Sequence, residues 1–144
     1  MTKTDVFLDT TILIHALVGA PALAERALGL LEAGGTVSVQ VLNECANTLR
    51  RKFSSDWPEI KLALERIREL CAVVPVSEEI HARGLDLAER YVLSTYDAMI
   101  VAAALTTGCT VLYSEDMHDG LIIDRLTVRN PYRDPPAPSE RDKA

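Results

Sequence analysis

The stretch VFLDTTILI at residues 6–14 contains the change of pattern that decides the fold. Its first three residues form a short apolar run typical of a buried strand, and the polar residues that follow end this run. A second apolar pattern starts at Ile12 and continues until Gly19 and Pro21 close it. We therefore expect a short strand that passes directly into a second apolar segment, with Asp9 at the junction.

Helix-like and strand-like patterns alternate along the rest of the chain. In some segments apolar residues recur at helical spacing, while others are short runs of strand-forming residues. This alternation is typical of an α/β fold with a mostly parallel sheet. The expected helices span residues 21–31, 41–53, 56–71, 77–92 and 96–105, with Thr95 as the expected cap of the last one. The expected strands span residues 6–8, 36–39, 72–74, 110–113 and 126–128.

Length and composition indicate one globular domain. The chain has 144 residues, of which 48% are hydrophobic and 25% charged, so it can build a single core. We expect one domain over residues 1–132 and a flexible, Pro-rich C-terminal tail at residues 133–144. No apolar run approaches the roughly 20 residues that span a bilayer, so no membrane partner is expected. The chain has three cysteines, an odd number without close pairing, which suits a reducing cytoplasm better than a disulfide scaffold. Asp5 places a charge where the apolar stretch of a secretory signal peptide would begin, so a cytoplasmic protein is expected.

The net charge is concentrated in two parts of the chain. There are 15 Lys+Arg and 21 Asp+Glu, and the resulting charge of −6 taken alone argues against a nucleic-acid partner. However, the acidic excess lies in residues 1–46 and 91–116, which are otherwise rich in apolar residues. Acids among apolar residues require an explanation, because burying an unpaired carboxylate costs free energy.

Four of these acids follow strands or open helices. Asp9 and Asp116 follow strands, while Glu44 and Asp97 lie near the starts of helices. Ordinary right-handed crossovers would bring all four to the same edge of a parallel sheet, where ligands bind in such folds. Carboxylates without His or Cys companions suit hard cations such as Mg²⁺ or Mn²⁺. Two such ions can activate a water and stabilise the leaving oxygen in phosphodiester cleavage, and they supply the positive field that a phosphate substrate needs.

Each acid also has a simpler interpretation. A single Asp after a strand is commonly a helix cap or turn residue, and Glu44 alone can be a solvated helix residue. Position and spacing therefore leave both a joint metal site and four separate structural roles open.

Four segments together resemble the PIN-domain ribonucleases, and among these most closely the VapC-type toxins of bacterial toxin–antitoxin systems. The resemblance covers roughly residues 5–130, with the motifs in family order. The segments are FLDTTIL at residues 7–13, VQVLNE at residues 39–44, YDAMIVAAA at residues 96–104 and LYSEDMHDG at residues 112–120.

The resemblance implies a three-layer α/β/α sandwich and a Mg²⁺- or Mn²⁺-dependent endoribonuclease, the toxin of a type II pair. It assigns the catalytic, metal-binding acids to Asp9, Glu44, Asp97 and Asp116, with Asp119 as a secondary candidate. It also implies an RNA substrate, a homodimer, and an antitoxin whose tail fills the acidic groove. Such a tail often places an arginine near the carboxylates.

The first motif departs from the family pattern at its third position. That position is usually Asn or Ser, and here it is Thr11, whose hydroxyl can hold Asp9 but whose branched carbon restricts the rotamer. Thr10, Thr11 and Ser114 are candidates for hydrogen bonds that orient the acids. Because Thr11 departs from the family pattern, an alternative remains open, namely a catalytically weak or inactive protein of this fold that binds RNA or a partner. A phosphoryl-transfer enzyme of the haloacid-dehalogenase type fits poorly, because it needs a second Asp at this position.

Overall fold

The strand expected at residues 6–8 lies near the centre of one sheet. The computed structural model describes residues 5–133, and six short strands form the sheet within this range. The strands are β1 (Val6–Leu8), β2 (Gly35–Ser38), β3 (Cys71–Val74), β4 (Val111–Tyr113), β5 (Ile122–Ile123) and β6 (Leu126–Arg129). Their order across the sheet is β3-β2-β1-β4-β6-β5. All neighbours are parallel except β5 and β6, which pair antiparallel.

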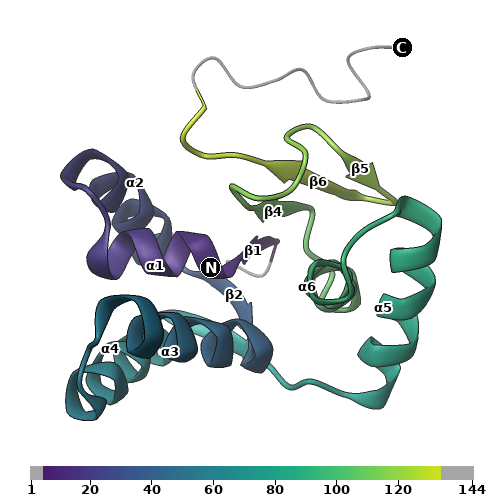
Figure 1. The fold of residues 1–144 in the computed structure, drawn as a ribbon. Coiled ribbons are helices and arrows are strands. Elements are labelled where there is room, and N and C mark those ends of the chain that lie inside the picture. The colour runs from purple at the N-terminus through teal and green to yellow at the C-terminus, as the bar shows by residue number, and fades with distance from the viewer. Residues whose placement is uncertain (1–4, 134–144) are drawn as a thin grey trace.

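Helices cover both faces of this sheet (Figure 1). The first four helices lie on one face, and the last two pack together on the other. This is the arrangement that right-handed crossovers produce when the chain reverses its direction across the sheet. The helices are α1 (Thr10–Val18), α2 (Pro21–Glu32), α3 (Val39–Phe53), α4 (Trp57–Leu70), α5 (Glu78–Tyr91) and α6 (Thr95–Thr106).

Polar side chains fix where the helices begin. Asp9 caps α1, because its Oδ1 accepts a hydrogen bond of 2.6 Å from the Thr10 N–H. Ser38 caps α3, so that this helix follows β2 with no intervening loop. The residue that caps α6 is Ser94, whose Oγ accepts from the backbone of the third residue of the helix, rather than the expected Thr95.

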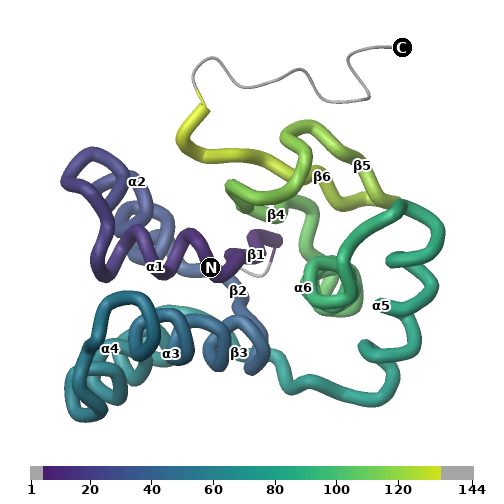
Figure 2. The backbone as a smooth tube through the Cα atoms, viewed as in Figure 1, coloured from purple at the N-terminus to yellow at the C-terminus, as the bar shows by residue number. Residues whose placement is uncertain are grey.

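The core packs against both faces of the central strands. Phe7 and Leu8 of β1 and Leu112 of β4 are fully buried, and so is most of α6 from Ala98 to Ala104. Figure 2 shows β4 lying alongside β1, where Phe7 pairs with Leu112 across more than a hundred residues of sequence. A helix that is apolar on all sides is stable only when covered, and α5 provides that cover. The packing of α6 therefore holds its N-terminus, and Asp97 in its first turn, at a fixed place beside the sheet.

The structure confirms the α/β/α sandwich with a mostly parallel sheet. The two-residue strand β5 was not expected. Cys45, Cys71 and Cys109 are buried, and none of them forms a disulfide bond within the described residues. Nearly all of the expected C-terminal tail, residues 134–144, lies outside the described residues. In the described part of the chain, no helix has both the length and the apolar character needed to cross a membrane.

Candidate acidic site

A pocket opens at the carboxyl edge of the sheet, where β1 and β4 end. It has a volume of about 560 Å³, and side chains from α1, α3, α6 and the segment after β4 line it. All four acids of the sequence-predicted set line this one pocket, together with a fifth carboxylate that was not expected. These acids are Asp9, Glu44, Asp97, Glu115 and Asp116.

Asp9 is the most deeply buried of the five acids, with 3% of its surface exposed. Its Oδ1 accepts from the Thr10 N–H, and its Oδ2 accepts a 2.6 Å hydrogen bond from the Ser114 hydroxyl. Burial raises the pKa of Asp9 from 3.8 to about 6, although these two hydrogen bonds oppose the rise. The nearby Asp97 and Asp116 raise this pKa further by charge repulsion. The position thus makes ionisation of this carboxyl more costly than in water, a cost that a bound cation would offset.

Ser114 connects the ends of the two central strands. Its side chain is completely buried, and its hydroxyl donates to Asp9. The same oxygen accepts hydrogen bonds of 3.3 Å from the backbone N–H groups of Asp116 and Met117. The sequence-based expectation that Ser114 orients an acid therefore agrees with the geometry. Its contacts also fix the turn that carries Asp116.

Glu44 is held by the neighbouring helix α1. The Thr10 hydroxyl donates a 2.7 Å hydrogen bond to Glu44 Oε1. Gln40, one turn earlier on α3, lies 3.4 Å from Glu44 Oε2 and also donates a 3.0 Å hydrogen bond to the Tyr96 carbonyl. Thr10 thus contacts both Asp9, through its backbone, and Glu44, through its side chain.

Asp97 enters the pocket from the first turn of α6. Its backbone N–H bonds to Ser94 Oγ, as an N-cap requires. Burial raises the pKa of Asp97, a hydrogen bond from Ser94 opposes this, and the Asp116 charge adds to the rise. Asp116, in the segment after β4, is exposed and also lines the pocket. The mutual repulsion of these acids shows that their charges meet in one place.

His15 and Glu115 also line the pocket, and sequence reasoning missed both. His15 Nε2 lies 2.8 Å from Glu115 Oε1, and the His15 ring meets Tyr132 edge-on at 5.0 Å between centroids. The partners are a hundred residues apart in sequence, so no local pattern joins them. The available signal was that Glu115 precedes an acid already singled out, and that His15 lies on the helix that Asp9 caps.

Thr11 and Asp119 lie differently from the other candidates. The Thr11 hydroxyl is buried and makes no hydrogen bond within residues 5–133, so the contact with Asp9 that was expected of it is not made. Asp119 does not line the pocket, since its Oδ1 accepts from the Asn130 N–H and its carboxylate lies about 4 Å from the guanidinium groups of Arg129 and Arg133. These contacts place Asp119 in the support of the segment that follows β6.

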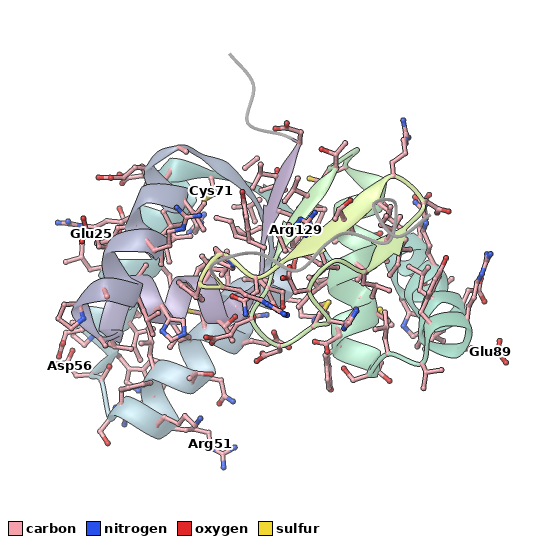
Figure 3. The ribbon with its side chains drawn as sticks, turned by 90° about the horizontal axis from the view of Figure 1, so that it is seen from above. Glu25, Arg51, Asp56, Cys71, Glu89 and Arg129 are labelled. Atoms are coloured by element: carbon pink, nitrogen blue, oxygen red, sulfur yellow. The ribbon has the colours of Figure 1, made fainter. Side chains whose placement is uncertain are left out.

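Basic residues gather in the last turn of α3, at Arg50, Arg51 and Lys52. Lys52 lines the pocket, whereas Arg51 points outward from the helix end (Figure 3). Arg50 stacks over the Trp57 ring at 5.0 Å and donates to the Ser55 carbonyl. Cations in the last turn complement the helix dipole, so most of this cluster has a structural explanation.

The donor chemistry of the pocket fits a hard divalent cation. Carboxylate oxygens are the ligands that Mg²⁺ and Mn²⁺ prefer. Burial is the main cause of the raised pKa of Asp9, and the charges of Asp97 and Asp116 add to it, so a cation in the pocket would oppose both effects. Across residues 5–133, no three acidic, histidine or cysteine side chains converge tightly enough to form a closed metal cage. Mg²⁺ commonly keeps several waters and takes only one or two carboxylates directly, so an open acidic pocket still suits it.

Fold and site together define an α/β/α protein with an acidic pocket at the carboxyl edge of its parallel sheet. A model of the PIN domain matches residues 6–118, and the chain belongs to the PIN domain family. A comparison with the curated proteins finds no similar sequence.

Solved structures of toxins share this fold. A toxin–antitoxin complex from Klebsiella pneumoniae superposes with a TM-score of 0.69 at 22% identity, covering 88% of this chain and 98% of that one. VapC20 from Mycobacterium tuberculosis, described as a toxin that cleaves the sarcin–ricin loop, superposes with a TM-score of 0.65 at 20% identity, covering 77% of this chain and 89% of that one. VapBC2 from Rickettsia felis, bound to a DNA fragment from its promoter, superposes with a TM-score of 0.62 at 16% identity, covering 85% of this chain and 96% of that one. At these identities the likeness concerns the fold.

Proposed function

We propose that this protein is a Mg²⁺- or Mn²⁺-dependent endoribonuclease that acts as the toxin of a type II toxin–antitoxin pair. The observation that carries the proposal is the convergence of five carboxylates, one of them deeply buried, in a single pocket at the carboxyl edge of the sheet. Membership of the PIN domain family supports it. The similar folds of toxins, among them one described as cleaving the sarcin–ricin loop, agree with the same activity.

In this proposal Asp9, Asp97 and Asp116 hold the principal ion, directly or through water. A bound divalent ion supplies a water of lowered pKa and neutralises charge on the scissile phosphate. Ser114 keeps the Asp9 carboxylate in one orientation, because it donates to Oδ2 while the Thr10 N–H donates to Oδ1. Both hydrogen bonds stabilise the ionised form, which is the form that binds a cation.

Glu44 orients the attacking water or helps to hold a second ion. Thr10 fixes Glu44 Oε1, so that Oε2 can accept a proton from the water as it attacks phosphorus. When the attacking water displaces the 3′-oxygen, the P–O3′ bond breaks and the products are a 5′-phosphate and a 3′-hydroxyl. Two divalent ions would cancel the charge of the four acids, which removes most of the electrostatic objection to an RNA substrate.

The proposal includes partners as well as a substrate. An antitoxin would place a basic segment against the acidic pocket, and the similar solved structures include toxin–antitoxin complexes. The toxin itself would form homodimers in the cytoplasm. Co-expression with the product of a neighbouring small reading frame, followed by size-exclusion chromatography, tests both the complex and the dimer.

A non-catalytic protein that binds RNA or a partner is the second candidate. The Thr11 hydroxyl favours it, because within residues 5–133 this buried group makes no hydrogen bond to Asp9 or to any other residue. The two candidates differ in one assay, in which purified protein is incubated with total RNA in Mg²⁺, in Mn²⁺ and in EDTA. The nuclease gives new 5′-phosphate ends with either metal and none in EDTA. RNA bound but uncut under all three conditions identifies a binding protein.

A further inference from the structure

A second hollow adjoins the acidic pocket on the side of α6. It has a volume of about 690 Å³ and shares Glu44 and Asn47 with the acidic pocket. The rest of its lining includes Gln40 and Asn43 from α3 and Tyr96 from α6. Since the two hollows share a wall, a polymer held at the acids would extend into the second one.

Tyr96 is an exposed aromatic side chain in an unusual place. Of its surface, 67% is accessible, although it precedes a predicted catalytic acid, Asp97. Gln40 bonds to the Tyr96 carbonyl at 3.0 Å and lies 3.4 Å from Glu44, so the backbone that carries the ring is tied to the acidic site. An exposed ring on a fixed support is the kind of surface on which an unstacked nucleobase stacks.

Asn43 and Asn47 lie one helical turn apart on the same face of α3. Both side chains are exposed, and in the described part of the chain neither amide is bonded to another protein group. An amide presents a donor and an acceptor together, which matches the edge of a nucleobase.

The charge of the hollow selects the kind of group that it accepts. Among the described residues, its lining contains no Lys or Arg, and it does contain the Glu44 carboxylate. A phosphate would therefore be repelled, whereas a neutral base could stack on Tyr96 and bond to the amides. This separates the hollow from the acidic pocket, in which cations would receive the phosphate.

We propose that this hollow is a nucleobase subsite, in which Tyr96 stacks on a base next to the scissile phosphate and Asn43 and Asn47 bond to its edge. The inference rests on the proposed RNA substrate and adds the chemical origin of sequence preference. It requires an unpaired base, because a base within a duplex has no free face. The substrate is then single-stranded or looped RNA.

The first experiment does not depend on cleavage. The ¹⁵N-labelled protein in EDTA is titrated with adenosine, guanosine, cytidine and uridine, which carry no phosphate, with ribose as the control without a base. The side-chain amide signals of Asn43 and Asn47 should shift and saturate with at least one nucleoside, and stay unchanged with ribose. Equal shifts with ribose, or none with any nucleoside, would overturn the subsite.

The second experiment uses cleavage of a short oligoribonucleotide that spans a mapped cut, with intact and abasic flanking positions. Tyr96→Ala should raise KM roughly 5- to 100-fold with little change in kcat, since base stacking contributes to binding. Tyr96→Phe should keep the wild-type KM, and on the abasic substrate all three proteins should be equal. Leu62→Ala, which removes an exposed apolar side chain of α4 away from both hollows, should change nothing.

The two experiments distinguish failure of the subsite from failure of the proposed function. If the protein cleaves no RNA, the proposed function is wrong and the nucleoside titration alone decides the subsite. If it cleaves RNA with the same KM for Tyr96→Ala and wild type, the subsite is wrong and the function stands. If Tyr96→Ala fails to fold, Asn43→Ala replaces it, with an increased KM expected on the intact substrate alone.

Discussion

Asp9→Asn should make the metal-free protein more stable at neutral pH, although it removes a residue proposed to be essential for activity. The reason is the burial of Asp9, which raises its pKa from 3.8 to about 6. Because the folded-state pKa exceeds the unfolded one, the folded state binds the proton more tightly. Ionisation of Asp9 therefore lowers the free energy of unfolding as the pH rises from about 4 to 7.

The size of the effect follows from the pKa difference. At 1.36 kcal/mol per pKa unit, the ionised Asp9 destabilises the fold by about 3 kcal/mol at pH 7.5 and by about 1 kcal/mol at pH 4.5. Asparagine is uncharged but cannot accept from both Ser114 and the Thr10 N–H, which costs about 1 kcal/mol. The net gain is about 2 kcal/mol at pH 7.5, or roughly 6 °C in Tm, and near zero at pH 4.5.

Urea unfolding followed by circular dichroism in EDTA, at pH 7.5 and 4.5, measures this difference. Asp119→Asn is the matched control, because Asp119 is also buried but accepts from the Asn130 N–H and lies near two arginines. It should lose about 1–3 kcal/mol at pH 7.5. A variant Asp9→Asn that is no more stable than wild type at pH 7.5, or whose advantage persists at pH 4.5, would refute the reasoning.

Three further substitutions test the supports of the site. Ser114→Ala should weaken Mn²⁺ binding roughly 10-fold or more in a calorimetric titration, because Asp9 loses a hydrogen bond that favours its ionised form; unchanged affinity contradicts the assigned role. Thr10→Val should lower kcat for RNA cleavage roughly 10-fold with little change in Tm, since it frees Glu44, and Thr10→Ser should restore it; equal kcat for all three shows the bond to be dispensable. Gly84→Ala should destabilise the protein by about 1–3 kcal/mol in urea, because its Cβ would overlap a methionine of α6; full stability would mean that α5 and α6 repack freely.

Most of the fold could be predicted because its signals are local. The junction at Asp9 marks both the end of β1 and the cap of α1, and the glycines and caps bound the other helices. The two-residue strand β5 has no such signal, because it exists only through its pairing with β6. The start of α6 was misplaced by one residue, since Ser94 and Thr95 are both good caps and only the backbone geometry separates them.

The acids of the site could be predicted for a similar reason, since the carboxyl ends of parallel strands meet at one edge. What sequence could not supply was the direction of side chains. Asp119 lies only three residues from Asp116 but turns toward Asn130. The pairing of His15 with Glu115 depends on how α1 packs against the segment after β4, which no local pattern encodes.

The most direct test of the account compares wild type with Asp97→Asn in cleavage of RNA in Mg²⁺. Asp97 lines the acidic pocket, and the Asn amide oxygen can accept the hydrogen bond that Ser94 gives to the Asp97 carboxylate, so the variant should fold. The account predicts that wild type produces 5′-phosphate ends in Mg²⁺ while Asp97→Asn, with an unchanged circular dichroism spectrum, loses nearly all of this activity. Equal cleavage by the two proteins would contradict the claim that the acidic pocket is the metal-dependent active site.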